Sequence, residues 1–193
     1  AGLGEWECVY GMPGAIGGAE GVNAGAYGSG MSAVLDWADI LTSDGELRRV
    51  TCEEVGFACR HSDWPECAIV LRARLRGTPD APDAIRERLA EIRASREASQ
   101  PVRARTGGST FRNPEGHKAW ALIDKAGCRG LTLGGAQVSE KHCNFLLNIG
   151  EANSEQLETL GETVRKKVLD RSGIDLHWEI RRIGRRDVGE KTV

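Results

Sequence analysis

The sequence predicts an α+β fold in two parts, with a break near residues 77–101. Residues 34–41 and 46–50 flank Ser43-Asp44-Gly45, and an Asp-Gly turn between two such runs is typical of a β-hairpin. A further strand is expected over residues 68–75. The second half combines two helical periodicities with one alternating run, so each part is expected to carry both helices and strands.

The break itself is a turn-rich segment followed by a helix. Gly77-Thr78-Pro79-Asp80-Ala81-Pro82 interrupts the strand pattern. Residues 83–99 then place Ile85, Leu89 and Ile92 on one face, which predicts an amphipathic helix, and Gln100-Pro101 ends it. This is the best position for a domain boundary.

The second half predicts two helices and a strand. Residues 117–126 suit a helix with Trp120, Ile123 and Ala126 turned inward, ended by Gly127. A longer helix is expected from Ser154, as its cap, to Ser172, with Gly173 after it. Its buried stripe consists of Leu157, Leu160, Val164 and Val168. Residues 174–180 alternate between apolar and polar, which predicts a half-buried strand.

Composition excludes several classes of protein. The net charge of -2 gives no electrostatic footprint for nucleic acid. No apolar run approaches the roughly 20 residues that span a membrane. The six cysteines are scattered without a Cys-x-x-Cys pair, so we expect them to be mostly reduced and buried in a cytoplasmic protein, with no metal site.

Residues 11–30 form a run dense in glycine, where backbone is expected to approach a partner that a Cβ would block. A dinucleotide-binding Rossmann loop fits poorly, because Pro13 interrupts the pattern and residues 21–30 are too rich in glycine for a helix. The glycines could simply make turns in a small sheet. Their density, with Asn23 among them, favours backbone amides that face the pyrophosphate of a cofactor.

Five blocks of sequence stand out in order along the chain. The blocks are Gly11-Met12-Pro13-Gly14-x-x-Gly17-Gly18-Ala19 with Asn23-Ala24-Gly25-Ala26-Tyr27-Gly28; Arg60-His61-Ser62; Gly108-Ser109-Thr110-Phe111-Arg112-Asn113-Pro114; Gly134-Gly135-Ala136-Gln137-Val138-Ser139-Glu140-Lys141-His142-Cys143-Asn144-Phe145; and Leu176-x-x-Glu179-Ile180-x-x-Ile183-Gly184. Together they resemble the blocks of one enzyme family, UDP-N-acetylenolpyruvoylglucosamine reductase or MurB. They run across nearly the whole chain, which makes the resemblance specific.

The resemblance implies an architecture and a reaction. Residues 1–77 would be the C-terminal half of an FAD-binding domain of the PCMH type, 78–101 a linker and helix, and 102–193 the substrate-binding domain. The family reduces the enolpyruvyl ether of UDP-N-acetylglucosamine to UDP-N-acetylmuramate, a step in peptidoglycan synthesis. Hydride passes from NADPH through FAD to the vinyl group, which leaves an enolate-like carbanion.

Three residues match the catalytic positions of the family. Ser109 would donate a proton to the carbanion, a role that demands a dry site because a hydroxyl is a weak acid. Arg60 would hold the substrate carboxylate and stabilise its developing charge. Glu179 would face that carboxylate from the opposite side, protonated or strongly hydrogen-bonded. Without the resemblance, Ser109 would be a turn residue, and Arg60 and Glu179 would be surface residues.

The remaining matches concern binding. Asn113 matches a substrate contact, and Lys141 and His142 are expected near the diphosphate or uridine. For His142, a purely structural place between a loop and a strand has nearly equal weight. The glycine-rich segment would bind FAD through a further set of residues: Gly14, Gly17, Gly18, Asn23, Gly25 and Gly28.

The chain also departs from the family pattern. Cys59 stands where the family usually has Tyr, and the interval from Arg60 to Ser109 is short, as in the family class without an extra tyrosine-bearing loop. The upstream flavin subdomain is missing, so we expect the C-terminal part of a longer protein. Two alternatives therefore stay open, a UDP-sugar-binding module without redox chemistry and an inactive truncated fragment. A monomer is expected.

Overall fold

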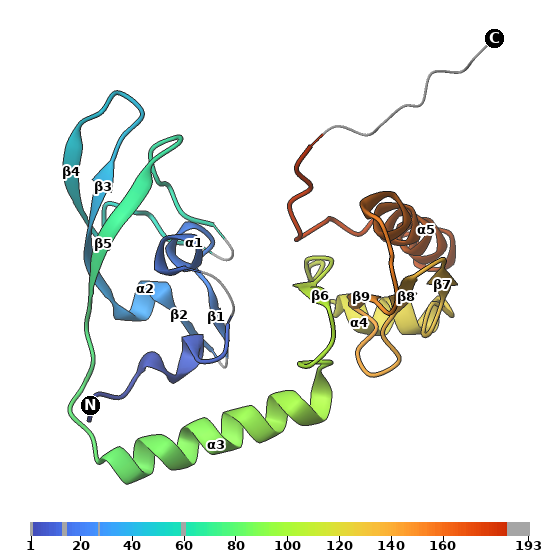
Figure 1. Ribbon diagram of the computed structural model, residues 1–193, viewed down its shortest axis with the longest axis horizontal. Helices are drawn as coiled ribbons and strands as arrows, with labels where there is room; N and C mark the ends of the chain where they lie inside the picture. The colour runs from blue at the N-terminus through green and yellow to red at the C-terminus, as the bar shows by residue number, and fades with distance from the viewer. Residues whose placement is uncertain (1, 13–14, 27, 59–60, 185–193) are drawn as a thin grey trace. The chain divides into compact units, whose positions relative to one another are not determined.

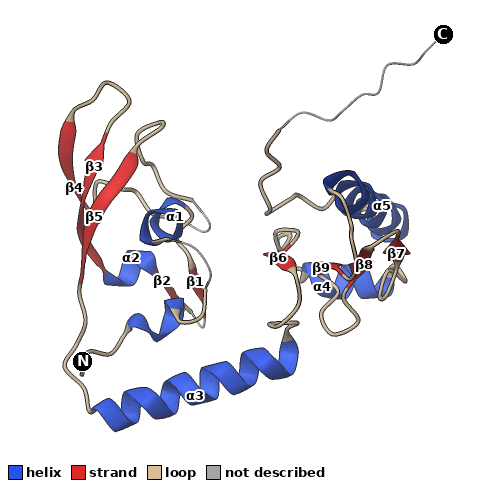
Figure 2. Cartoon of the chain, viewed as in Figure 1, coloured by secondary structure: helices blue, strands red, loops and turns tan. Residues whose placement is uncertain are grey.

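The computed structural model describes residues 2–12, 15–26, 28–58 and 61–184, and the chain divides into two compact units. Unit 1 is Ala1–Ser95 and unit 2 is Arg96–Val193. Each unit contains helices and antiparallel strands (Figures 1 and 2), which confirms the predicted α+β class.

Unit 1 begins with short elements that pack on one another. They are the 3-10 helix η1 (Trp6–Val9), α1 (Ile16–Gly21), the two-stranded sheet of β1 (Gly25–Ala26) and β2 (Ser29–Gly30), and α2 (Met31–Val34). Their core consists of Ala24, Met31 and Val34, with Trp6 and Phe57 among the side chains packed against it. The helix α1 lies inside the glycine-rich run, where no helix was predicted.

The larger sheet of unit 1 confirms the predicted hairpin and third strand. It is antiparallel in the order β4-β3-β5, with β3 at Leu35–Leu41, β4 at Leu47–Thr51 and β5 at Ile69–Leu75. One face buries Leu35, Ala38, Ile40 and Val50 in a core of its own.

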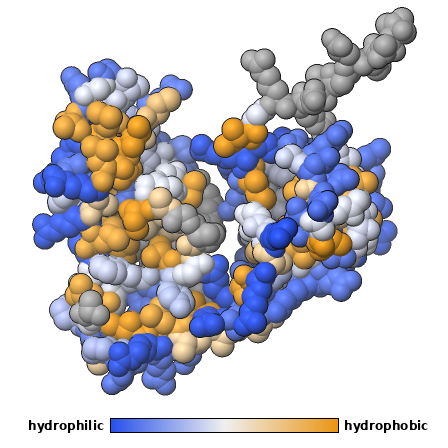
Figure 3. All heavy atoms as spheres, viewed as in Figure 1, coloured by the Kyte–Doolittle hydropathy of each residue, from blue (hydrophilic) through white to orange (hydrophobic). Residues whose placement is uncertain are grey.

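The other face of this sheet is open and carries both charge and apolar surface. The Asp39 carboxylate accepts hydrogen bonds from Arg49 and Arg72 on the two neighbouring strands, at 2.7 and 2.5 Å. Arg49 also lies 3.6 Å above the ring of Trp37. Figure 3 shows hydrophobic residues gathered over these strands, where Leu47, Ile69 and Leu71 are exposed.

The predicted amphipathic helix is α3 (Pro82–Ser99). Ile85, Leu89 and Ile92 are half-buried, while most other positions are exposed. Arg88 joins the helix to unit 1, because its guanidinium pairs with the carboxylates of Glu7 and Asp80 at 2.7 and 2.6 Å.

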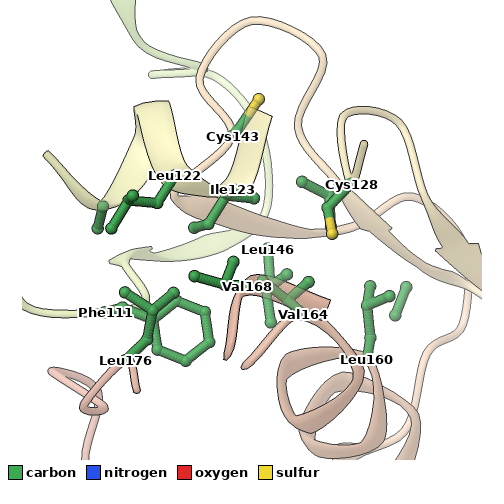
Figure 4. Close-up of a cluster of buried hydrophobic side chains, with 13 residues drawn as sticks. Phe111, Leu122, Ile123, Cys128, Cys143, Leu146, Leu160, Val164, Val168 and Leu176 are labelled. Carbon is green, nitrogen blue, oxygen red and sulfur yellow. The ribbon is translucent and has the colours of Figure 1, made fainter. Parts of the chain in front are cut away.

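Unit 2 is a four-stranded antiparallel sheet with two helices. The elements are β6 (Thr106–Ser109), α4 (Ala119–Lys125), β7 (Thr132–Leu133), β8 (Ala136–Val138), β9 (Phe145–Asn148) and α5 (Ser154–Ser172), with strand order β6-β9-β8-β7. Figure 4 shows Leu160, Val164 and Val168 of α5 meeting Ile123 of α4 and Leu146 of β9 in one core.

Both predicted helices of unit 2 are confirmed, with two corrections. On α4, Trp120 was expected inside but is 43% exposed, and the buried positions are Ala119, Leu122 and Ile123. On α5, the cap is Asn153 rather than Ser154. Its Oδ1 accepts the Gln156 N–H at 2.9 Å, and the Gln156 side chain accepts the Asn153 N–H in return.

The predicted strand over 174–180 is wrong. The alternation in burial is present, since Leu176 is fully buried between exposed neighbours. However, among the described residues of unit 2, a single isolated bridge, between Phe111 and Trp178, joins this segment to its neighbours as a strand would. The segment is extended chain covering the core, and its alternation reflects one-sided burial rather than a ladder of hydrogen bonds.

The described cysteines are free thiols. Cys8, Cys128 and Cys143 are buried and Cys52 is half-buried, whereas Cys67 is exposed and departs from the expected pattern. Within the described ranges, no helix has the length and apolar character that crossing a bilayer requires.

One carboxyl is buried in unit 1 without compensation. Glu20 on α1 is fully buried, and neither of its oxygens has a hydrogen-bond partner among the described residues. Burial raises the pKa of this carboxyl from 4.5 to about 7.

The buried carboxyl predicts a pH-dependent stability of unit 1. Because its pKa is raised in the folded state, the folded protein binds more protons than the unfolded chain between pH 4.5 and about 7. The free energy of unfolding therefore falls as the pH rises through this window. Above the window, the total loss of stability is roughly 3 kcal/mol. We expect Glu20→Leu to stabilise unit 1 by roughly 2–3 kcal/mol at pH 8 and by much less at pH 5, measured by urea unfolding. The exposed Glu53→Leu is the control, and an equal gain at both pH values would contradict the prediction.

The cap of α5 makes a second prediction about stability. Asn153→Ala removes the acceptor for an N-terminal amide, so the free energy of unfolding of unit 2 should fall by about 1 kcal/mol. Ser154→Ala, one residue further on, should change it by only a few tenths of a kcal/mol. Thermal unfolding followed by circular dichroism measures both, and a larger loss for Ser154→Ala would restore the cap predicted from the sequence.

Candidate functional site

Ser109 is the last residue of β6, opposite Phe145 of β9. The backbone before it needs glycine, since Gly108 has a φ of +87° and a Cβ on Gly107 would lie 3.1 Å from Ile180 Cδ1. The side chain is half-buried, and within the described ranges its hydroxyl has no hydrogen-bond partner. The Ser109 hydroxyl is therefore available to an external group.

Glu179 lies beside the residue that follows Ser109, although the two are far apart in the sequence. The Glu179 N–H donates to Thr110 O at 2.8 Å, and the Arg112 N–H donates to His177 O at 2.9 Å. These two bonds flank the bridge between Phe111 and Trp178. The structure thus brings two of the three predicted catalytic residues together within unit 2.

The third predicted catalytic residue, Arg60, lies outside the described residues, as do Cys59 and Gly14. The chain after Arg60 is fastened to α1, because Ser62 Oγ donates to Gly21 O at 2.8 Å.

The predicted cofactor glycines fall into two groups. Gly17 and Gly25 are required by packing, since a Cβ would lie 3.1 Å from Val70 Cβ at the first position and 2.1 Å from Ser29 O at the second. At Gly18 and Gly28 an added Cβ would meet no atom within 4 Å. These two leave backbone open to an external group.

Asn23 is used by the fold itself. Its φ is 44°, in the left-handed region, which Asn tolerates better than most residues. Its Oδ1 accepts the Ser32 N–H and its Nδ2 donates to Ala58 O, both at 3.0 Å. Asn23 therefore ties the glycine-rich segment to the chain just before Cys59 and Arg60.

Asn113 and Lys141 also have partners within unit 2. Asn113 is exposed, and its Oδ1 accepts the Ala119 N–H at 2.9 Å, in the first turn of α4. Lys141 Nζ donates to Glu97 O. Lys141 and Arg103 line a depression of about 540 Å³, together with Glu97 and the residues around Pro101.

His142 sits in an aromatic setting. Its ring lies edge-on to Phe145, with centroids 4.9 Å apart, and 6.3 Å from Trp120. Its Nδ1 accepts the Asn144 N–H at 3.3 Å. Burial lowers the pKa of this imidazole, so it is neutral near pH 7. These contacts suit a purely structural role for His142, the alternative to substrate binding. The exposed Trp120 nevertheless leaves an aromatic surface beside the His142 ring.

Sequence reasoning gave no role to Asn144, which fixes the backbone after Ser109. Asn144 is buried, its Oδ1 accepts the Phe111 N–H at 3.0 Å, and its Nδ2 donates to Phe111 O at 2.8 Å. Its backbone oxygen accepts the Thr110 N–H at 2.8 Å. An Asn before the apolar run of residues 145–147 was the available signal, because a buried amide needs such partners.

Comparison with known proteins gives a family match that lies within unit 2. Residues 100–183 match the family described as UDP-N-acetylenolpyruvoylglucosamine reductase, C-terminal domain. The whole chain is 71% identical to the UDP-N-acetylenolpyruvoylglucosamine reductase of Gluconobacter oxydans and covers 63% of that protein. Over 95% of the chain, it is 60% identical to the reductase of that name in Acidiphilium cryptum, of which it covers 60%.

A solved structure agrees with the sequence relatives. The crystal structure of MurB from Thermus caldophilus matches 92% of the chain with a TM-score of 0.81 and 32% identity, and 64% of that protein is covered. The chain thus spans about three fifths of the length of its relatives. On this evidence, the chain is similar over its whole length to UDP-N-acetylenolpyruvoylglucosamine reductases, and residues 100–183 within unit 2 match the C-terminal domain of that family.

Proposed function

We propose that the protein containing this chain is a UDP-N-acetylmuramate dehydrogenase, a flavin-dependent oxidoreductase that acts on a carbon–carbon double bond. It would use NADPH and FAD to reduce UDP-N-acetylglucosamine enolpyruvate to UDP-N-acetylmuramate in peptidoglycan synthesis, as a cytoplasmic monomer. The observation that carries this proposal is the hydrogen bond from the Glu179 N–H to Thr110 O, which sets Glu179 next to Ser109. Two residues able to move or share a proton thereby lie on neighbouring backbone segments of unit 2.

The described part of the glycine-rich segment fits FAD at two positions. At Gly18 and Gly28 no atom of the described residues lies within 4 Å of where a Cβ would stand, so a diphosphate could approach their backbone. Gly17, Gly25 and Asn23 would act indirectly, because they hold the shape of the segment. When bound, FAD would supply hydride transfer between NADPH and the vinyl group of the substrate.

Ser109 would donate the proton that completes the reduction. A hydroxyl is a poor acid in water, so the role requires an oxygen held in a fixed place and shielded from solvent. The half-buried Ser109 pairs with Phe145 of β9, and Asn144 holds the backbone that follows it. Its hydroxyl makes no hydrogen bond to the described part of the protein.

Glu179 and Arg60 would bind the substrate carboxylate from opposite sides. Arg60 supplies positive charge to the enolate-like intermediate. Two ionised carboxylates in a dry site repel, so Glu179 would be protonated or strongly hydrogen-bonded when substrate is present.

The rest of the substrate would lie along unit 2. Asn113 would contribute its Nδ2, since its Oδ1 is engaged by α4. Lys141 would give up its contact with Glu97 O to meet the diphosphate, and the aromatic surface of His142 and Trp120 would face the uracil ring.

A second candidate function rests on unit 2 alone. The family match falls within Arg96–Val193, which has its own core, so this part could hold a UDP-sugar without redox chemistry. Titration of the 193-residue chain with UDP-N-acetylglucosamine and with FAD separates the two candidates. The reductase predicts that FAD binds with a change in its absorption spectrum. Sugar-nucleotide binding without any flavin binding would favour the module, and binding of neither would indicate an inactive fragment.

The proton-donor role makes a sharper prediction. In the flavin-loaded full-length protein, Ser109→Ala should lower turnover by roughly 10²- to 10⁴-fold, because a positioned general acid contributes about that much. NADPH oxidation dependent on the enolpyruvyl sugar nucleotide is the measurement. Ser154→Ala, on the exposed start of α5, is the matched control. Unchanged turnover with full flavin loading would eliminate Ser109 as the donor.

A further inference from the structure

The segment that carries Glu179 has no strand of its own to hold it. Residues 174–182 follow the C-terminus of α5, and a single bridge at Trp178 with the backbone bonds beside it joins them to Thr110–Arg112. So short a pairing is a weak restraint on backbone position. Side chains must supply the remaining restraint on Glu179.

Trp178 is one such restraint, because its indole lies across α5. A Cβ on Gly161 would be only 2.1 Å from Trp178 Cη2, so α5 presents bare backbone where the ring rests. The ring also contacts Phe111, with centroids 5.0 Å apart and ring planes tilted by 52°. Since side chains alternate along extended chain, anchoring Trp178 on α5 directs the next side chain, that of Glu179, away from α5.

The Glu162 carboxylate gathers three donors around this ring. Its Oε1 accepts from Trp178 Nε1 at 2.9 Å and from Arg182 Nη1 at 3.2 Å. Its Oε2 accepts from Arg165 Nη1 at 2.8 Å. Charge-assisted hydrogen bonds of this kind are stronger than those between neutral groups.

Arg165 extends the network to the start of the segment. Its Nε donates to Leu176 O at 2.7 Å, and its Nη2 donates to both Asp175 oxygens at 2.9 and 3.0 Å. Arg182 follows Glu179 in the sequence, and its guanidinium is 4.7 Å above the Trp178 ring. One carboxylate on α5 is therefore linked to the chain both before and after Glu179.

We propose that Glu162 is a positioning residue that holds Glu179 beside Ser109, through Trp178, Arg165 and Arg182. The inference rests on the proposed catalytic role of Glu179, but the restraint itself can be measured separately. Glu162 touches neither the substrate nor the reacting atoms. Its effect on the reaction comes from the place it gives to Glu179.

Amide hydrogen exchange in the 193-residue chain tests the restraint. We expect Glu162→Ala to speed exchange of the Glu179 N–H at least tenfold, while the Val164 and Val168 amides of α5 keep their rates. Alanine favours helix, so a loss of protection at Glu179 would not come from unwinding of α5. Glu155→Ala, an exposed carboxylate in the first turn of the same helix, is the matched control.

Two further variants separate positioning from a general loss of structure. Glu162→Gln keeps an acceptor for the Trp178 N–H and should restore part of the protection. Trp178→Phe removes the indole donor together with part of the ring that rests on Gly161. Adding Glu162→Ala to it should cost less than in the unsubstituted chain, because the hydrogen bond between the two residues is already lost. Unchanged exchange at Glu179, or equal acceleration throughout α5, would overturn the proposal.

Kinetics of the full-length protein then test the consequence. Glu162→Ala should lower kcat about tenfold with little change in KM for the enolpyruvyl sugar nucleotide, since a misplaced group affects the reacting geometry more than binding. In a Glu179→Gln background it should have no further effect. Faster exchange at Glu179 with unchanged kcat would refute the positioning role. If the unsubstituted protein does not oxidise NADPH with this substrate, the proposed function fails, and hydrogen exchange still decides whether Glu162 holds the segment.

Discussion

The pairing of Thr110–Arg112 with His177–Glu179 is the contact on which the candidate site depends. It consists of one bridge and the backbone hydrogen bonds around it, yet it joins the end of β6 to the chain that leaves α5. Without it, Ser109 and Glu179 would lie on elements that share no hydrogen bond. The pairing is possible because Asn144 satisfies the remaining backbone groups of Phe111, which leaves that strand edge in a fixed place.

The core of unit 2 supports the same pairing from beneath. Phe111 and Leu176 are both almost fully buried; Phe111 lies within the pairing, and Leu176 comes just before it in the chain. Figure 4 shows them side by side, facing Val164 and Val168 of α5. Burying side chains of this size contributes about 1.5–3 kcal/mol each, more than a single exposed hydrogen bond, so packing sets the position that the polar network then refines.

Much of the fold follows from local sequence, and the errors have physical causes. Periodicity and turn chemistry located the hairpin, α3, α4 and α5. The alternation over residues 174–180 did not make a strand, because the side chain of Trp178 packs on a helix and, in the part of the chain that the structure describes, no second strand runs along the segment. Ser154 and Asn153 are both good caps, and only the hydrogen bond to Gln156 distinguishes them. The roles expected of Ser109 and Glu179 came from resemblance, whereas those of Asn144 and Glu162 depend on contacts that the sequence does not reveal.

The glycine-rich segment illustrates a limit of the same kind. A glycine needed by the fold and a glycine needed by a ligand look alike in sequence, and the structure separates them by what a Cβ would meet. At Gly17 and Gly25 a Cβ would collide with other protein atoms, and Gly28 needs glycine for its φ of +82°. At Gly18 neither reason applies, because a Cβ there would meet no atom of the described residues within 4 Å. The buried Glu20 lies on α1 together with Gly17 and Gly18. Its carboxyl has no hydrogen-bond partner among the described residues, so it lowers the stability of unit 1 at neutral pH. A ligand that binds folded unit 1 would offset part of this cost, because its binding adds directly to the free energy of unfolding.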